Sequence, residues 1–291
     1  MPFGAIEAGG TKFLCGVGTT LDDLQFIEVP TTTPEETLRH VAGFLLDQKI
    51  GAIGLGCFGP VDLNRQSPTY GHITATPKLA WRNFDIVGWL ERELKVPVAF
   101  DTDVNAAALG EGQWGAAQGM SDFLYFTAGT GIGGAAVTGG RLVHGVMHPE
   151  MGHIPVRRHP QDTFAGLCPS HGDCLEGLAS GPALAARCGV PAQQLPETHA
   201  AWDMEAFYIA QAAASAALFY SPEAIVFGGG LFHQPHLLPR VQSAYERLLA
   251  GYLARPARLL PTHLANAGLA GALILARDLV GARTRRNATS R

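Results

Sequence analysis

The hydrophobic and polar positions in the first half of the chain alternate between a strand-like and a helix-like pattern. Strand-like runs lie at residues 4–8, 12–17, 24–29, 51–57 and 96–100. Helix-like stretches lie at residues 84–94 and 105–114, and a third helix is predicted to start after Thr33, the expected N-cap, with Glu36 closing a capping box. Alternating strands and helices favour an α/β fold.

The second half of the chain starts the same pattern again. Residues 123–127 and 132–137 are strand-like and flank a turn of small residues, about 120 residues after the Gly9-Gly10-Thr11 turn between the first two strands. Apolar helices are then expected at residues 202–220, 235–253 and 266–279, around a strand at 224–227. We therefore predict two related lobes, residues 1–118 and 119–291, with a C-terminal helix near 266–281 that can pack back on the first.

Composition and charge narrow the classes of function. A chain of 291 residues with 47% hydrophobic residues suits two domains, and a net charge of -4 argues against a nucleic-acid-binding face. The basic residues Arg283, Arg285, Arg286 and Arg291 are expected to form a solvated tail. No apolar run approaches the roughly 20 residues that span a membrane, and the chain leads directly into a strand. A cytoplasmic protein is expected, in which the five cysteines form no disulfide framework.

Three glycine-rich segments are candidates for binding phosphate or a nucleotide. Glycine lets backbone amides approach an anion closely, so two facing turns, residues 9–12 and 129–131, could clamp a polyphosphate. Taken alone, either turn is better explained as a tight link between strands. The second turn matches G-x-G-x-x-G, but the following residues are strand-like, which excludes a dinucleotide fingerprint, and the first is no Walker A loop. Residues 228–230 follow a strand and suit a flat ring or phosphate, or only a tight turn.

An acidic segment lies between a predicted strand and helix, where α/β folds place ligand-binding groups. It reads Asp101-Thr102-Asp103-Val104-Asn105. Asp103 is a candidate general base that accepts the proton of a hydroxyl during phosphoryl transfer. The simpler interpretation, helix capping by Asp103 or Asn105, is as good on the local sequence.

Two histidines and two cysteines have the spacing of a zinc site. His153, Cys168, His171 and Cys174 form H-x14-C-x2-H-x2-C, which suits a closed, structural, tetrahedral zinc ion. Packed cysteines and surface histidines are the alternative. Zinc would also fix the neighbouring carboxylates of Glu150 and Glu176, and a zinc-bound His153 could offer its second nitrogen to a substrate. Residues 148–153 are a poor match to a metalloprotease because proline and glycine interrupt the helix.

Together these motifs resemble the ROK family of sugar kinases and repressors, within the actin-like ATPase and hexokinase superfamily. The motifs are Glu7-Ala8-Gly9-Gly10-Thr11-Lys12-Phe13, Gly59-Pro60-Val61-Asp62, Thr102-Asp103-Val104-Asn105, Gly129-Thr130-Gly131-Ile132-Gly133, Glu150-Met151-Gly152-His153, the Cys/His cluster with Glu176, and Gly228-Gly229-Gly230. The first of them, with Thr74-Ala75-Thr76-Pro77-Lys78 and the segment 148–153, is most similar to the bacterial fructokinase branch.

The resemblance implies two actin-like, ribonuclease H-like lobes around a cleft, a zinc loop in the second lobe, and specific roles. Asp103 is the implied general base, and sugar contacts fall on Gly59, Pro60, Asn105, Glu150, His153 and Glu176. Nucleotide contacts fall on Gly9, Gly10, Thr11, Lys12, Thr130, Gly131, Gly228, Gly229 and Gly230, with Glu7 near magnesium. Glu7, Thr102 and His171 depart from the commoner family pattern, which puts the sugar preference in doubt more than the reaction type.

The function expected from the resemblance is ATP-dependent phosphorylation of a hexose, with fructose at its six-position favoured. Glucose and mannose remain alternatives because a few hydrogen bonds separate these sugars. The competing class is regulatory: ROK repressors carry an N-terminal DNA-binding domain, for which a first strand starting by Gly4 leaves no room. A catalytically silent sugar sensor is disfavoured by Asp103 and both turns. The resemblance also implies a homodimer.

Overall fold

The computed structural model describes residues 1–289, without the side chains of residue 283 and residues 285–289. It divides into two compact units. Unit 1 comprises Met1–Gly115, His144–His148 and the chain from Leu264 onward, and unit 2 comprises Ala116–Val143 and Pro149–His263. The predicted basic cluster at Arg283, Arg285, Arg286 and Arg291 lies outside the described side chains.

Unit 1 is built on a five-stranded sheet in the order β3-β2-β1-β4-β7. Its strands are β1 (Phe3–Ala8), β2 (Lys12–Gly18), β3 (Gln25–Pro30), β4 (Ile53–Cys57) and β7 (Val98–Thr102), with a small pair β5 (His72–Ile73) and β6 (Phe84–Asp85). Its helices are α1 (Pro34–Leu45), α2 (Ile86–Leu94), α3 (Asp103–Trp114) and α8 (Ala267–Thr289), with 3-10 turns η1 (Leu46–Gln48) and η2 (Leu79–Trp81).

Unit 2 contains a second five-stranded sheet, in the order β10-β9-β8-β11-β12. Its strands are β8 (Phe123–Ala128), β9 (Ile132–Thr138), β10 (Arg141–Leu142), β11 (Ala224–Gly228) and β12 (Arg258–Pro261). Its helices are α4 (Leu175–Ala179), α5 (Gly181–Cys188), α6 (Ala201–Tyr220) and α7 (Leu237–Leu249), with 3-10 turns η3 (Met151–His153), η4 (Ala192–Gln194) and η5 (Gly230–His233).

The two sheets have the same topology. In unit 1, β1 pairs with β2 antiparallel and with β4 parallel, and β4 pairs with β7 parallel. In unit 2, β8 pairs with β9 antiparallel and with β11 parallel, and β11 pairs with β12 parallel. The predicted α/β class and the duplication are therefore confirmed, and the duplicated feature extends from the turn motif to the whole sheet.

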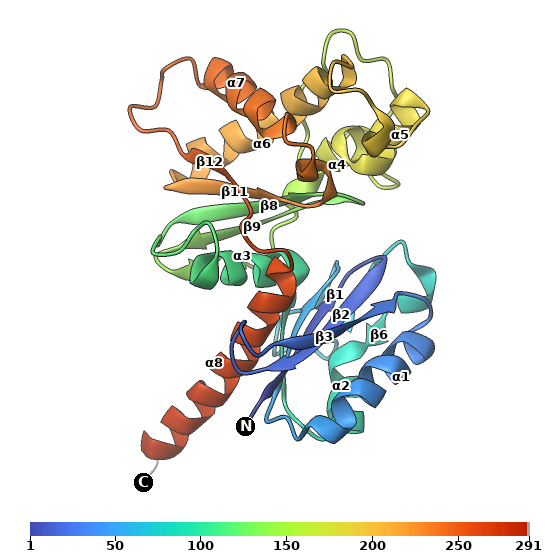
Figure 1. Cartoon of the computed structure of the whole chain (residues 1–291), viewed down its shortest axis with the longest axis vertical. Coiled ribbons are helices and arrows are strands. Elements are labelled where there is room, and N and C mark those ends of the chain that lie inside the picture. Colours follow the sequence, from blue (N-terminus) through green and yellow to red (C-terminus); the bar gives the residue numbers. More distant parts are fainter. Residues whose placement is uncertain (290–291) are drawn as a thin grey trace. The chain divides into compact units, whose positions relative to one another are not determined.

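Helix α8 packs against α3, β1 and β4 within unit 1, as Figure 1 shows in red. Small residues allow the close approach of these backbones. A Cβ atom on Gly54 of β4 would lie 1.7 Å from the Ala272 carbonyl oxygen, and one on Gly271 would lie 1.6 Å from that of Ala106. Any side chain at Gly54 would force α8 away from β4, and any side chain at Gly271 would force α8 away from α3. This packing places the last helix of the chain in direct contact with α3.

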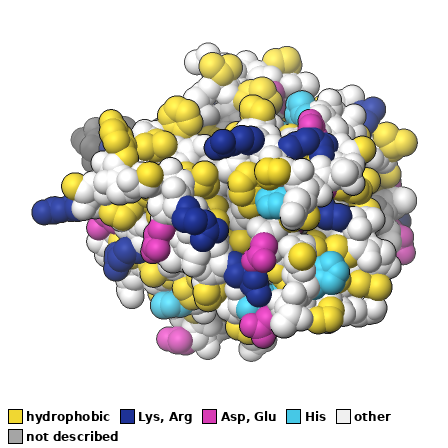
Figure 2. Space-filling view, turned by 90° about the horizontal axis from the view of Figure 1, so that it is seen from above, with side chains coloured by type: hydrophobic (Ala, Val, Ile, Leu, Met, Phe, Trp, Pro, Cys, Tyr) yellow, Lys and Arg dark blue, Asp and Glu magenta, His cyan; other side chains and the backbone are white. Residues whose placement is uncertain are grey.

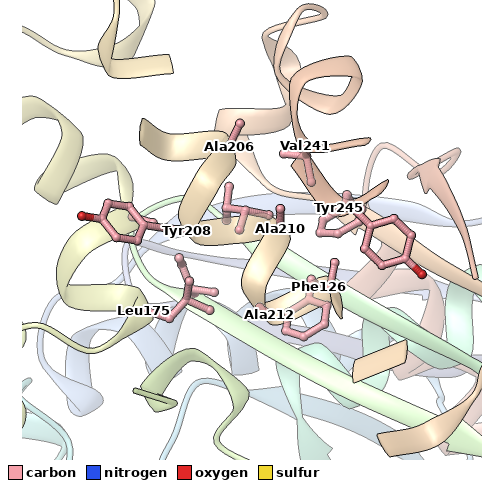
Figure 3. Close-up of a cluster of buried hydrophobic side chains, with 14 of the residues drawn as sticks. Phe126, Leu175, Ala206, Tyr208, Ala210, Ala212, Val241 and Tyr245 are labelled. Atoms are coloured by element: carbon pink, nitrogen blue, oxygen red, sulfur yellow. The ribbon is translucent and has the colours of Figure 1, made fainter. Parts of the chain in front are cut away.

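Helix α6 forms the centre of the core of unit 2. It is apolar on nearly all sides, as expected of a helix that is buried all round. Its residues Ala206, Ala210 and Ala212 pack with Phe126 of β8 and with Tyr245 of α7 (Figure 3). Alanine at these positions lets the sheet and the neighbouring helices approach α6 closely. Helix α6 therefore lies at the centre of the packing that positions the other elements of unit 2.

Local signals differ from the predictions at a few helix ends. Thr33 caps α1, but the Glu36 carboxylate accepts the Thr32 hydroxyl at 2.7 Å and does not complete the predicted capping box. The segment after Gly229 forms the short 3-10 turn η5, and α7 begins at Leu237, two residues after the predicted helix start at 235. Among the residues that the structure describes, no helix combines the length and apolar character that crossing a membrane requires.

Candidate functional site

The first turn of α3 holds the predicted general base in a fixed position. Thr102 is the N-cap, and its hydroxyl accepts the Asn105 amide at 3.1 Å. The capping role therefore belongs to Thr102, and the simpler interpretation of Asp103 and Asn105 as caps is wrong. Asp103 is the first helical residue and accepts the Val104 amide at 2.8 Å. Its carboxylate is thus placed at a helix N-terminus, where the helix dipole favours the ionised form.

A buried carboxylate that we did not predict supports this turn. Asp101, at 5% exposure, accepts the Asn105 side-chain nitrogen at 2.6 Å and the Thr102 amide at 2.8 Å. Its other oxygen lies 2.8 Å from His144 Nε2. Asn105 is 1% exposed, and one of the two N–H groups of its amide nitrogen donates to Asp101, which leaves its amide oxygen and its second N–H for a ligand.

Residues 144–148 form a strap that belongs to unit 1, although the chain on both sides of it belongs to unit 2. The His144–Asp101 contact holds one end of the strap, and at the other end His148 Nε2 accepts the Val61 amide at 3.1 Å. Because an acceptor nitrogen carries no proton, His148 has its hydrogen on Nδ1. The strap thereby links the start of α3 to the segment that carries Gly59 and Pro60.

The Gly59-Pro60 segment is also held from a second side. The Pro60 carbonyl oxygen accepts both the amide and the hydroxyl of Thr74, at 2.8 and 3.0 Å. A cis peptide bond joins Gly59 and Pro60. The two predicted sugar-contacting residues therefore lie in a segment that hydrogen bonds fix on both flanks.

The turn between β1 and β2, residues 9–11, is a tight hairpin. Gly9 donates its amide to the Lys12 carbonyl at 3.0 Å, and its own carbonyl accepts the Thr31 hydroxyl at 2.8 Å. The Lys12 ammonium lies 2.6 Å from the Glu28 carboxylate in an exposed ion pair. Exposed pairs of this kind contribute about 0–1 kcal/mol, so Glu28 orients Lys12 only weakly.

Glu7, the residue implied to lie near magnesium, contacts the last helix. Its carboxylate accepts the Leu269 amide at 2.9 Å in the first turn of α8. Burial raises the pKa of the Glu7 carboxyl, and the Leu269 amide and the positive charge of Lys12 lower it by less. A nearby divalent cation would favour the ionised form further. Sequence reasoning missed the helix contact because the two residues lie at opposite ends of the chain.

In unit 2, the turn between β8 and β9, residues 129–131, gathers two other predicted segments. The Gly129 carbonyl accepts the Gly181 amide at 2.8 Å at the start of α5. The Glu176 carboxylate accepts the Ile132 amide at 2.9 Å. Gly229, with φ of +88°, packs on the turn so closely that a Cβ atom would lie 2.4 Å from the Ala128 carbonyl oxygen. The predicted phosphate and adenosine segments of unit 2 are therefore neighbours.

We expect Gly229→Ala to disturb this arrangement strongly. Gly229 has φ of +88° and ψ of 165°, a backbone region that is essentially restricted to glycine, so alanine there costs about 1–3 kcal/mol, and the overlap with Ala128 adds about 1–3 kcal/mol. Gly119→Ala is the matched control, because Gly119 has φ of +81° but no atom within 4 Å of its Cβ position. Urea unfolding of both variants measures the difference. Equal losses of stability would show that the close contact contributes nothing.

The four predicted zinc ligands come together in unit 2. One ligand atom from each of His153, Cys168, His171 and Cys174 lies within 4.8 Å of the others. His153 Nδ1 is 3.6 Å from the sulfur of Cys168 and 3.5 Å from that of Cys174. In a tetrahedral zinc site the usual bond lengths separate sulfur from nitrogen by about 3.6 Å. The donor set and its spacing therefore fit zinc.

The loop around these ligands is tightly folded. Cys168 and Gly172 exchange two backbone hydrogen bonds, at 3.1 and 2.8 Å, and Gly172 has φ of +65°. The pKa of the Cys174 thiol is raised to about 11, chiefly by burial, with smaller contributions from the neighbouring Cys168 that a hydrogen bond from the Gly177 amide partly offsets. Because zinc binds the thiolate, it has to displace this proton, so affinity for zinc should rise with pH.

Glu176 connects the zinc ligands to the β8–β9 turn. One carboxylate oxygen binds the Ile132 amide, and the other lies 4.0 Å from His153 Nε2. His153 thus presents Nδ1 to the cysteines and Nε2 toward a carboxylate, an orientation that fixes a metal-binding imidazole. Glu150 lies at the entry to η3, where its carbonyl accepts the His153 amide at 3.0 Å.

A buried charged cluster, which sequence reasoning missed, attaches this loop to α6. Asp162 pairs with Arg187 at 3.0 Å and accepts the Tyr208 hydroxyl at 2.6 Å. Burial raises the pKa of Asp162, but the hydrogen bonds from Tyr208, Arg187 and the Phe164 amide outweigh it and leave the pKa lowered. Figure 3 shows the Tyr208 hydroxyl directed away from the labelled hydrophobic side chains.

We expect Tyr208→Phe to lower the free energy of unfolding by about 1–3 kcal/mol, because Asp162 loses a buried hydrogen bond. Since the folded pKa of Asp162 is lowered, its stabilising contribution is present above the ordinary aspartate pKa of about 3.9 and is lost as the pH falls below it. The difference between the two proteins in urea unfolding should therefore shrink in acid. A difference that stays constant below pH 4 would contradict this account.

Comparison with known proteins places the chain in a family. The family model for ROK matches residues 3–279. The chain belongs to the ROK family. A fructokinase of Lactococcus lactis subsp. cremoris is 43% identical, with 87% of each chain covered. A fructokinase of Zymomonas mobilis is 42% identical over 94% of this chain and 96% of the relative, and a Streptomyces coelicolor glucokinase is 32% identical over 94% and 96%.

Solved structures of ROK kinases have the same fold. A ROK hexokinase from Thermus thermophilus gives a TM-score of 0.78 at 30% identity, with 97% of this chain and 99% of that chain covered. A ROK family glucokinase from Streptomyces griseus, solved with glucose and AMPPNP, also gives 0.78, at 28% identity over 96% and 100%. The resemblance inferred from the motifs is therefore confirmed over nearly the whole chain.

Proposed function

We propose that this ROK protein transfers the γ-phosphoryl group of Mg-ATP to a hexose, and that D-fructose, phosphorylated at its six-position, is the favoured acceptor. The observation that carries the proposal is the identity of 42–43% to two fructokinases that the chain matches over most of their length. The positions of the motif residues support the reaction type. The names of those relatives support the choice of sugar.

In the proposed mechanism Asp103 accepts the proton of the sugar hydroxyl as that hydroxyl attacks the γ-phosphorus. Thr102 and Asp101 fix the first turn of α3, so the carboxylate is oriented before the sugar arrives. Pre-positioning of this kind lowers the barrier because no reorganisation is needed during the reaction. The Asn105 amide oxygen is the atom we assign to a sugar hydroxyl, since the hydrogen bond from its nitrogen to Asp101 fixes the orientation of the amide.

The remaining sugar contacts are assigned to backbone, carboxylate and imidazole groups. We assign them to Gly59, Pro60, Glu150, His153 and Glu176. Zinc would contribute by holding His153 and, through the loop, Glu150 and Glu176 in place. Four protein ligands leave no open position on the ion, so its role in the proposal is structural.

Nucleotide contacts are assigned to the glycine-rich segments of both units. They are Gly9, Gly10, Thr11 and Lys12 in unit 1, and Thr130, Gly131, Gly228, Gly229 and Gly230 in unit 2. The contact between Gly229 and the β8–β9 turn supports the second group, because it brings an amide-lined turn beside a glycine-lined surface. Glu7 would lie near the magnesium of Mg-ATP, which would offset the negative charge of the phosphates. A homodimer remains a prediction.

Glucose or mannose is the second candidate acceptor, favoured by the 32% identity to a glucokinase over 94% of this chain. The two candidates share Asp103 and the nucleotide contacts, and they differ only in the hydrogen bonds to sugar hydroxyls. Such differences are worth factors of tens to thousands in kcat/KM, which a direct comparison of substrates resolves.

The test is a panel of fructose, glucose and mannose with Mg-ATP, assayed on zinc-loaded protein with ADP release as the readout. We expect the highest kcat/KM for fructose and phosphorylation at its six-position, identified by NMR of the product. A higher kcat/KM for glucose or mannose would transfer the proposal to the second candidate. No turnover on any hexose by folded, zinc-loaded protein would exclude the kinase function.

A further inference from the structure

Lysine 78 lies beside the β1–β2 turn. A Cβ atom built on Gly10 would be 3.3 Å from Lys78 Cε, so the end of the Lys78 side chain packs against the glycine at the centre of the turn. A lysine ammonium carries a positive charge at neutral pH, and the backbone amides of a glycine-rich turn add positive potential at the same place. Together they form a site that suits the oxygens of a phosphoryl group.

The backbone that carries Lys78 is anchored to the turn through Trp81. The Trp81 ring is 1% exposed and lies 5.3 Å from the ring of Phe13, which follows the turn in β2. Its indole nitrogen donates to the Thr32 carbonyl at 2.8 Å, and its amide donates to the Lys78 carbonyl at 2.9 Å. The position of Lys78 relative to the turn is therefore fixed by packing and not by the side chain alone.

Further hydrogen bonds stiffen the same segment. Thr76 is 1% exposed, its hydroxyl accepts the Lys78 amide at 3.3 Å, and its carbonyl accepts the Arg82 guanidinium at 3.1 Å. Preorganised charge of this kind stabilises a reacting phosphate more than a mobile charge, because no rearrangement is needed when the ligand arrives.

The two lysines next to this turn differ in their partners. Lys12 is 52% exposed and pairs with Glu28 on β3. Lys78 forms no ion pair and no side-chain hydrogen bond within the part of the chain that the structure describes. Its charge is therefore not offset by a carboxylate of the protein, whereas that of Lys12 is.

We propose that Lys78 binds the phosphoryl group that is transferred, and that it contributes more to this binding than Lys12. The expected effect of Lys78 on catalysis rests on the proposed kinase function. The expected effect on nucleotide binding does not depend on that function, because a nucleoside triphosphate would contact the same ammonium whether or not its phosphoryl group is then transferred. Sequence reasoning used Lys78 only as a motif residue and gave it no role.

The test compares Lys78→Ala, Lys78→Arg and Lys12→Ala with Lys95→Ala, a surface lysine at the end of α2. We expect Lys78→Ala to lower kcat/KM for Mg-ATP about 100-fold, the typical effect of losing one preorganised group on the developing charge. Lys78→Arg should recover part of the loss, Lys12→Ala should lose less, and Lys95→Ala should match wild type. Thermal melting identifies any variant that does not fold, and Lys78→Gln then replaces Lys78→Ala.

A second measurement tests nucleotide binding alone and does not require catalytic turnover. Calorimetric titration with Mg-AMPPNP should show at least about tenfold weaker binding to Lys78→Ala than to Lys95→Ala. If wild type phosphorylates no hexose while this difference persists, the proposed function fails and the Lys78 assignment stands. Equal AMPPNP binding and equal kcat/KM for Lys78→Ala and Lys95→Ala overturn the assignment. An effect confined to KM for the sugar overturns it as well, in favour of a sugar contact.

Discussion

Asp103→Asn should lower kcat for hexose phosphorylation by about 10³-fold while KM for ATP and for the sugar changes little. Asparagine has nearly the same shape, and its amide oxygen can still accept the Val104 amide that Asp103 accepts at 2.8 Å. What is lost is the ability to take the proton of the attacking hydroxyl. The expected loss therefore appears in the chemical step, and steady-state kinetics with each substrate varied in turn measures it.

Asp85→Asn is the matched control for this variant. Asp85 also lies at a helix start, where its carboxylate caps α2 by accepting the Gly88 amide at 2.7 Å. Its replacement should cost some stability and leave kcat close to that of wild type. If Asp103→Asn retains more than about a tenth of wild-type kcat, a general-base role is excluded, because such a role contributes at least about 10²-fold.

The predictions that succeeded rest on patterns within a few residues of one another. Strand, glycine turn and strand recur in both halves, and the short spacing of Cys168, His171 and Cys174 predicts that their side chains come together, as they do in the structure. These signals depend on local geometry, which the order of residues determines directly. The two sheets can be predicted from these turns, because each turn joins the pair of antiparallel strands from which its sheet is built.

The features that were missed depend on contacts between distant residues. The Asp101 carboxylate meets His144 across 43 positions of the chain, and Glu7 meets Leu269 across 262. Neither pair has a local pattern, because only the packing of α8 and of the strap brings the partners together. At the helix start the local signal was ambiguous, since Thr102, Asp103 and Asn105 are all good caps and the backbone selects one of them.

The distribution of charge on the surface indicates the position of the candidate site less clearly than these contacts do. Figure 2 shows a face on which lysine and arginine side chains are interspersed with acidic, histidine and hydrophobic ones. In contrast, a few carboxylates organise the candidate site, among them Asp101, which is buried, and Glu7, which is partly buried. The net charge of the chain therefore indicates only which classes of binding partner are excluded. The hydrogen bonds of individual carboxylates determine how the residues of the candidate site are held in place.

Replacement of a zinc ligand should have the largest effect on stability. Cys174→Ser removes a thiolate from the four-ligand group, and we expect loss of about one zinc ion per chain and a melting temperature lower by about 10 °C or more. The loop from Cys168 to Gly172 is held by only two backbone hydrogen bonds of its own, so it should open without the metal. Hexose kinase activity should fall with it, because His153 and Glu176 lose their fixed positions.

Cys188→Ser separates this effect from the general cost of replacing a cysteine. Cys188 is a free, partly buried thiol at the end of α5 in the same unit, outside the four-ligand group. Its variant should keep zinc, measured by mass spectrometry, and should melt close to wild type. Chelation of wild-type protein should reproduce the Cys174→Ser phenotype, and added zinc should reverse it. A Cys174→Ser protein with full zinc content and wild-type melting would contradict the metal site, because a hydroxyl binds zinc far more weakly than a thiolate.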